Sequence, residues 1–259
     1  MIEFDCHAHV YERVAAVAGA RYEPGAPAPL AAWRDSLRAH GLRGGVIVQV
    51  SFLGTDNSEL CAALEALDRR RFAGMAVVAP DVATAEIERL AALGVRGFRW
   101  NLVRGAPLPD LADPMVRRFL DRVFEWDMHL ELHLEGPRLA PWIGSLLAVG
   151  GKVVVDHFGL PSDPEPFADP WLSRIDRLPD VSRLYVKLSA RYRTGFELTA
   201  HAAYLADHLA ANRLVWGSDW PHTQHESRVG HALVAADRAR LAGLGDAAAV
   251  AQLYRLTPG

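Results

Sequence analysis

The stretch KVVVDHF, residues 152–158, is the clearest indicator of the fold class. Its three consecutive valines are typical of a strand buried on both faces, and such strands belong to parallel sheets that helices cover. An aspartate and a histidine follow directly, where the strand meets a loop. Seven similar short apolar runs are present, at residues 1–5, 44–50, 73–79, 94–100, 129–135, 183–190 and 212–219.

Segments with helical periodicity separate these runs. Apolar side chains recur in them every three to four residues, and cap or stop residues such as Asn57, Ser58 and Gly94 mark some of their ends. Eight strands alternating with helices predict one α/β domain over residues 1–259, a closed (β/α)8 or TIM barrel. An open doubly wound sheet is the competing architecture, but the sequence lacks the glycine-rich phosphate turn expected of it. The helical segments are residues 29–41, 56–70, 81–94, 113–127, 137–151, 170–180, 197–212, 226–243 and 246–256.

The composition argues against several classes of function. A net charge of −3 gives no basic footprint for nucleic acid. No apolar run reaches the ~18 residues that span a bilayer, and residues 1–10 lack the layout of a signal peptide. Cys6 and Cys61 form no CxxC pair, so we expect neither a disulfide framework nor a thiolate zinc site. We expect the protein to be cytoplasmic. We therefore expect a small-molecule substrate, no nucleic-acid or membrane partner, and helix faces that would allow a homodimer.

Reactive side chains gather at the predicted carboxyl ends of the strands. In a closed barrel these ends meet at one mouth, where catalytic residues lie. His7 and His9 are two residues apart in FDCHAHV (4–10), so both should point to one face of their strand and Cys6 to the face that meets the helices. The strand-end residues that we expect to form the site also include Ser51, Arg99, His133, His157, Arg193, Asp219 and His222.

Two of these groups require a partner of opposite or complementary character. A buried Asp219 carboxylate after the apolar LVWG run needs donors, and the histidines supply them. Arg99 ends an apolar strand and requires an anion, either an internal carboxylate or a substrate. Arg193, in ARYRTG (190–195), is either a loop charge or a substrate contact, and His133 is equally open. Ser51 has no base of its own, so we expect it to contact a ligand rather than attack one.

The order HxH after the first strand, histidine after the sixth and aspartate after the eighth resembles the amidohydrolase superfamily. The closer likeness is to its lactonase branch, the 2-pyrone-4,6-dicarboxylate lactonases. The matching segments span the chain. They are DCHAHV (5–10), ARYEPGAP (20–27), VIVQVSFLGTDNSE (46–59), GVRGFRWNLV (94–103), VVVDHFGLP (153–161) and RLVWGSDWPHTQH (213–225).

This resemblance implies a hydrolase that opens a lactone ring. Asp219 would be the general base that activates water, and His7, His9 and His157 would polarise the lactone carbonyl. The resemblance further implies that substrate carboxylates and the ring are contacted by Tyr22, Ser51, Arg99 and Arg193. We add His133 and His222 as further candidate substrate contacts.

The chain also departs from that lactonase pattern. Those lactonases carry a second arginine where this chain has Gly105, although Arg104 is one residue earlier and would compensate if the loop shifts. They have a tyrosine where this chain has His133. We therefore keep open a substrate with one carboxylate or a different lactone ring.

The resemblance leaves the role of a metal ion to be decided. A binuclear site is not expected, because residues 94–104 contain no lysine that could be carboxylated to bridge two ions. One zinc ion at His7, His9 and Asp219, with His133 or His157, is chemically reasonable. A lactone is an activated ester and the lactonase branch implies catalysis without metal, so we expect that no cofactor is required. The alternative functions are a metal-dependent decarboxylase of an aromatic acid, a sugar-lactone hydrolase and a non-catalytic binding protein.

Overall fold

The strands of the chain close into a barrel. The computed structural model describes residues 2–245 and 247–257, and in it eight parallel strands are hydrogen-bonded in sequence order. The predicted barrel is therefore confirmed; residues 1, 246, 258 and 259, which the predicted domain includes, lie outside the described residues. The strands are β1 (Phe4–Ala8), β2 (Gly44–Val48), β3 (Phe72–Ala76), β4 (Val95–Asn101), β5 (His129–His133), β6 (Lys152–Val155), β7 (Leu184–Ser189) and β8 (Leu214–Gly217).

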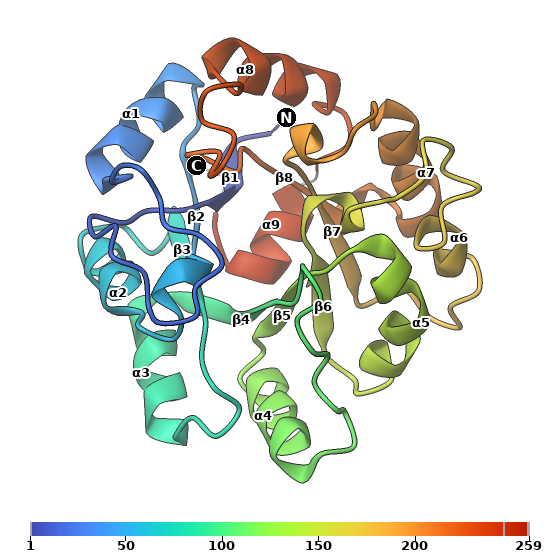
Figure 1. Cartoon of the computed structure of the whole chain (residues 1–259), viewed down its shortest axis with the longest axis horizontal. Helices are drawn as coiled ribbons and strands as arrows, with labels where there is room; N and C mark the ends of the chain where they lie inside the picture. The colour runs from blue at the N-terminus through green and yellow to red at the C-terminus, as the bar shows by residue number, and fades with distance from the viewer. Residues whose placement is uncertain (1, 246, 258–259) are drawn as a thin grey trace.

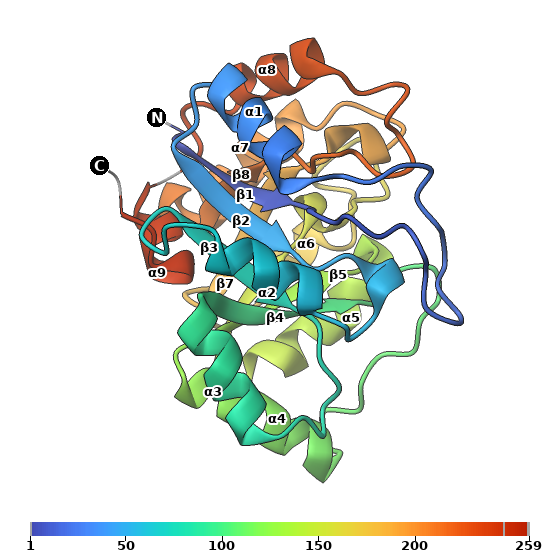
Figure 2. The same ribbon diagram turned by 90° about the vertical axis from the view of Figure 1, so that its left-hand side faces the viewer.

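Helices surround the barrel and close one of its ends. Figure 1 shows α1 to α8 around the strands, with α9 lying across the middle of the view. Figure 2 shows β1 and β2 pointing away from α9, so that α9 covers the amino ends of the strands and the long loop after β1 extends from the opposite end. The helices are α1 (Leu30–Ala39), α2 (Ser58–Glu65), α3 (Thr84–Leu93), α4 (Pro114–Glu125), α5 (Gly136–Leu147), α6 (Leu172–Ile175), α7 (Thr199–Leu209), α8 (His231–Arg240) and α9 (Ala247–Tyr254).

A β-bulge in β1 determines where its side chains point. Asp5 pairs with Gly45 of β2 and Ala8 with Ile47, so three steps along β1 match two along β2. Such an extra residue breaks the strict alternation of side chains. The prediction that Cys6 faces the helices is wrong for this reason: Cys6 is fully buried inside the barrel.

Two apolar clusters hold the barrel together. The larger one lies between the strands and the surrounding helices and includes Trp33, Leu60 and Phe119. The second contains residues from six strands and from α9, among them Cys6 and Tyr254, and fills the barrel's amino-terminal end. Burial of each such side chain contributes roughly 1.5–3 kcal/mol. The carboxyl ends of the strands are left for polar residues.

The described residues contain no helix that combines the length and the apolar character needed to cross a membrane.

Candidate active site

The seam between β1 and the end of β8 places Asp219 against the HxH pair. The Asp219 amide donates to the His7 carbonyl at 2.8 Å, and the His9 amide donates to the Trp220 carbonyl at 2.7 Å. A glycine is needed at 217, because a Cβ there would lie 2.5 Å from the Cβ of His7. These main-chain contacts bring a carboxylate from the end of the chain next to two imidazoles from its beginning.

The two oxygens of the Asp219 carboxylate have different environments. Oδ2 accepts hydrogen bonds from the Tyr192 hydroxyl at 2.6 Å and from Arg193 Nε and Nη2 at 2.9 and 2.7 Å. Oδ1 is buried and has no hydrogen-bond partner among the described residues. One oxygen is therefore fixed by three donors, while the other keeps its lone pairs available.

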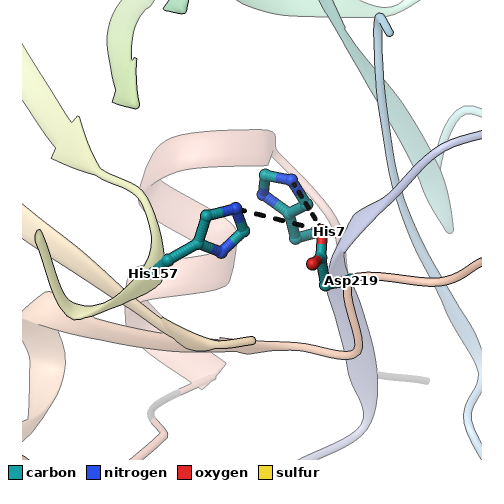
Figure 3. Close-up of side chains that lie close together, drawn as sticks. All are labelled: His7, His157 and Asp219. Carbon is teal, nitrogen blue, oxygen red and sulfur yellow. Dashed lines mark ion pairs between the residues drawn. The ribbon is translucent and has the colours of Figure 1, made fainter. Parts of the chain in front are cut away.

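Three imidazoles surround this free oxygen. The Nε2 atoms of His7 and His9 lie 3.6 Å from Asp219 Oδ1, and that of His157 lies 3.9 Å away. Figure 3 shows the rings of His7 and His157 directed at the carboxylate. These distances exceed those of hydrogen bonds, so an atom of water or substrate could be bound between the rings and the carboxylate.

Burial and neighbouring charge set the protonation of these groups. Burial raises the pKa of Asp219, but the Arg193 guanidinium and the His157 ring outweigh it and hold that pKa well below its usual value. Burial lowers the pKa of His7 to about 3 and that of His157 well below its usual value. At neutral pH the site thus contains an ionised carboxylate and neutral imidazoles of His7 and His157.

The hydrogen bonds of the outer ring nitrogens indicate the tautomers. His9 Nδ1 lies 2.8 Å from the Val48 carbonyl, which only accepts, so Nδ1 carries a proton and, in the neutral ring, Nε2 presents a lone pair. His7 Nδ1 lies 3.2 Å from the Lys187 ammonium, which only donates, and 3.3 Å from Asp156 Oδ1, which only accepts. Only the contact with Lys187 has the geometry of a hydrogen bond, and it favours the tautomer with the proton on Nε2. Towards the space beside Asp219 Oδ1, His7 therefore presents a donor and the neutral ring of His9 an acceptor.

Lys187 belongs to a charged network beneath the site. Its Nζ lies 2.6 Å from Glu131 Oε1 and 3.5 Å from Asp156 Oδ1, and all three side chains are 0% exposed. Glu131 also accepts a hydrogen bond from the Tyr254 hydroxyl at 2.9 Å, which connects the network to α9. The network holds His7 from below.

The backbone is strained at Asp219 and His157. Asp219 has a φ of 62° and His157 a φ of 54°, values in the left-handed region that non-glycine residues rarely adopt. Strain of this kind costs about 1–3 kcal/mol per residue and clusters at functional sites. The predicted strands at 152–158 and 212–219 end early for the same reason, at Val155 and Gly217.

A cavity of about 280 Å³ opens above the carboxylate and contains most of the predicted site. His7 and Asp219 are fully buried and do not line the cavity, whereas His9, His157 and Arg193, which lie within 4 Å of Asp219, do line it. His222 does not line it, and lies instead against Tyr192, with Nδ1 3.4 Å from the hydroxyl. The predicted residues that line the cavity are His9, Tyr22, Ser51, Arg99, His133, His157 and Arg193.

The two predicted substrate-binding arginines both have internal carboxylate partners. Arg99 Nε donates to Asp156 Oδ2 at 2.9 Å, and Arg193 is bound to Asp219. Both also line the cavity. The positive charge of each arginine is therefore largely balanced by a carboxylate of the protein, which leaves less of it to attract a substrate anion.

Sequence reasoning assigned no role to three residues that support the site. Tyr192 lies between the two arginines of ARYRTG, and its hydroxyl fixes Asp219. Lys187 and Glu131 are charged residues in the apolar runs RLYVKLSA and HLELHLE. A charge within an apolar run was the sequence feature that could have identified them. An isolated charge in a buried strand needs a partner from another strand, so the pair could have been sought together.

The site contains ligands for one divalent ion. His7, His157 and Asp219 each offer a ligand atom, and these atoms lie within 4.8 Å of one another. The unpartnered Oδ1 of Asp219 and the Nε2 lone pair of His9 are also suitable ligands for zinc. These side chains could hold a metal ion, although the proton on His7 Nε2 would first have to leave.

The chain is similar to proteins of the amidohydrolase family, among them two that are named as lactone hydrolases. A sequence model of the amidohydrolase family matches residues 4–258. A 4-sulfomuconolactone hydrolase from Rhizobium radiobacter is 25% identical over 85% of this chain and 76% of its own length. A 2-pyrone-4,6-dicarboxylate hydrolase from Comamonas testosteroni is 26% identical over 84% of this chain and 76% of its own.

A solved structure agrees closely with the whole barrel. It is that of a protein from Pseudomonas putida provisionally named a 2-pyrone-4,6-dicarboxylic acid hydrolase. This chain is 36% identical to it, covers 93% of it with 96% of its own length, and superposes with a TM-score of 0.82.

Proposed function

Because this chain belongs to the amidohydrolase family, we propose that it is a hydrolase that opens the ring of a carboxylate-bearing lactone resembling 2-pyrone-4,6-dicarboxylate. One observation above all supports this function. The ionised Asp219 has one oxygen fixed by three donors, while the other has no hydrogen-bond partner among the described residues and lies within 4 Å of three imidazoles, two of which, His9 and His157, line the cavity. A base and polar groups for a carbonyl are thus combined at one point.

Asp219 acts as the general base. Its Oδ1 takes a proton from water while the water oxygen forms a bond to the lactone carbonyl carbon. The electron pair of the C=O bond moves to oxygen and gives a tetrahedral intermediate. Collapse of this intermediate breaks the ring C–O bond, and the leaving oxygen takes the proton from Asp219. The product is an open-chain acid.

The imidazoles divide between the water and the carbonyl. His7 Nε2–H donates to the developing oxyanion, and His157, whose Nδ1 lies 2.8 Å from the Ser189 hydroxyl, lies beside it. His9 presents a lone pair and so accepts a hydrogen bond from the attacking water. In this respect the proposal differs from the expectation that all three rings polarise the carbonyl. Tyr22, Ser51, Arg99 and His133 contact the substrate.

We propose that no metal ion is required. A divalent ion held by His7, His9, His157 and Asp219 would act as a Lewis acid toward the carbonyl. Ligation of a metal by His7 requires a lone pair on Nε2. The Lys187 ammonium donates to Nδ1 and thereby favours a proton on Nε2. Arg193 already supplies Asp219 with a positive charge.

Removal of metal is expected to leave activity unchanged. After dialysis against a chelator, kcat should stay within about twofold of its initial value, because base and oxyanion donor both belong to the protein. Elemental analysis before and after dialysis, with assays of the same samples, tests this. Stoichiometric zinc together with loss of activity on chelation and its return with added zinc would contradict the proposal.

A panel of substrates tests the reaction itself. Ring opening, followed by the loss of lactone absorbance, should saturate with 2-pyrone-4,6-dicarboxylate or 4-sulfomuconolactone. Its kcat/KM should exceed that for a neutral sugar lactone by about 100-fold or more, since a charge-assisted contact contributes ~1.5–3 kcal/mol and several are available. Release of CO₂ from an aromatic acid instead would identify a decarboxylase. Preference for the sugar lactone, or binding without turnover, would support the other two alternatives.

A further inference from the structure

Among the described residues, two arginines at the rim of the cavity have guanidinium groups that form no ion pair. Arg21 lies on the loop after β1 and Arg104 on the loop after β4, and both line the cavity. The Arg21 guanidinium donates only to main-chain oxygens, of Val103 at 2.5 Å and of Asn101 at 3.3 Å. Arg104 Nη2 donates to the neutral Gln224 at 2.7 Å. Within residues 2–245 and 247–257, neither arginine forms an ion pair.

The charged residues next to Arg21 and Arg104 already have partners within the protein. Arg99 is paired with Asp156. Glu135, which also lines the cavity, accepts from the Arg104 amide at 2.6 Å and from Arg138 Nη1 at 3.1 Å. Burial, followed by the like charges of Arg104 and Arg99, lowers the pKa of Arg21. The rim therefore has an excess of positive charge that a bound anion would balance.

The loop that carries Arg21 is held in place by the protein itself. Tyr11 and Ala28 pair across its base through main-chain hydrogen bonds of 2.9 and 2.8 Å. The ring of Phe52 packs against Tyr11 at 5.0 Å and against Tyr22, the neighbour of Arg21, at 5.5 Å. A preorganised loop loses little entropy when a ligand binds, which favours a specific contact.

We propose that Arg21 and Arg104 form an anion subsite for a second acidic substituent of the substrate, a carboxylate or a sulfonate. This inference rests on the proposed function, since it places the lactone carbonyl at Asp219. In a ring of eight strands in sequence order, β4 lies opposite β8, so Arg104 lies across the mouth from Asp219. The Arg104–Gln224 contact joins the loops after these two strands. The anion subsite would thus bind the end of the substrate remote from the reacting carbonyl, and Arg21 would make the enzyme prefer lactones with two anionic groups.

Binding of non-hydrolysable analogues tests the subsite independently of turnover. Pyridine-2,4-dicarboxylate, 4-sulfopyridine-2-carboxylate and pyridine-2-carboxylate share a planar ring, and only the first two have a second anion. Their Kd values would be measured by calorimetry for the unmodified chain, Arg21→Met, Arg21→Lys and Arg104→Met. Arg118→Met, at an exposed position on α4, is the matched control. Thermal unfolding of each variant verifies its fold.

We expect the unmodified chain to bind at least one of the two dianionic analogues about 10- to 100-fold more tightly than pyridine-2-carboxylate. Arg21→Met should remove most of this preference and leave pyridine-2-carboxylate within about twofold, Arg104→Met should reduce it, and Arg21→Lys should retain part of it. Whichever dianion binds more tightly identifies the substituent as carboxylate or sulfonate.

The subsite would be overturned if the unmodified chain showed no preference for the dianionic analogues. It would also be overturned if folded Arg21→Met and Arg104→Met both kept the full preference of the unmodified chain. Either result would hold even if the enzyme opens lactones. Conversely, loss of the preference in Arg21→Met from an enzyme that hydrolyses no lactone would uphold the subsite and refute the proposed function.

Discussion

Replacement of Asp219 by asparagine is expected to lower kcat by about 10²- to 10⁴-fold, the range that general base catalysis contributes. The amide has nearly the same shape as the carboxylate. Its oxygen can still accept from Tyr192 and Arg193, which directs the NH₂ group toward the position of Oδ1. That group cannot take a proton from water. Because no substrate contact is removed, KM should change by only a few-fold, and steady-state kinetics separates the two parameters.

A matched variant distinguishes loss of the base from general disturbance of the site. Tyr192→Phe removes one of three hydrogen bonds to Oδ2 and leaves Oδ1 unchanged, so its kcat should fall by only about tenfold. Turnover of Asp219→Asn near that of the unmodified chain would show that another group activates the water. Equal losses in the two variants would indicate that Asp219 acts through the position of its neighbours and not as the base.

The barrel was predictable because its signal is repeated along the chain. Continuous apolar runs such as KVVVDHF require burial on both faces, and eight of them separated by helices leave few other architectures. The same regularity places strand ends at one mouth, which is why His7, His157 and Asp219 could be expected to meet. No contact between them had to be known in advance.

Local geometry was less predictable, because it depends on pairings between distant segments. The bulge in β1 arises from its register with β2, and a strand read alone gives no sign of it. It turned Cys6 into the barrel against the expectation from alternation. Likewise, the sequence around Arg193 is typical of a charged residue in a loop, and only the structure shows that Arg193 is bound to Asp219. His222 follows Asp219 closely in sequence but lies outside the cavity lining, after a main-chain turn.

Replacement of Lys187 by methionine is expected to destabilise the fold by about 3–5 kcal/mol, the usual effect of removing one partner of a buried ion pair. Methionine has a similar volume but no charge, so Glu131 and Asp156 would remain buried with less compensation. Chemical denaturation measures this difference. We also expect kcat to fall, because His7 Nδ1 would lose its donor and could donate to Asp156 at 3.3 Å instead. Nε2 would then lack the proton that the oxyanion needs.

The double variant Lys187→Met with Glu131→Gln separates stability from positioning. Removing the charge of Glu131 should restore a large part of the free energy of unfolding, since less unpaired charge stays buried. It should not restore kcat, because Asp156 would still draw the proton of His7 to Nδ1. The exposed lone pair on Nε2 should also increase affinity for zinc over that of the unmodified chain, a change that altered stability alone would not produce. Recovery of both stability and kcat would mean that Lys187 supports the fold only. Unchanged zinc affinity would mean that Lys187 does not determine the tautomer of His7.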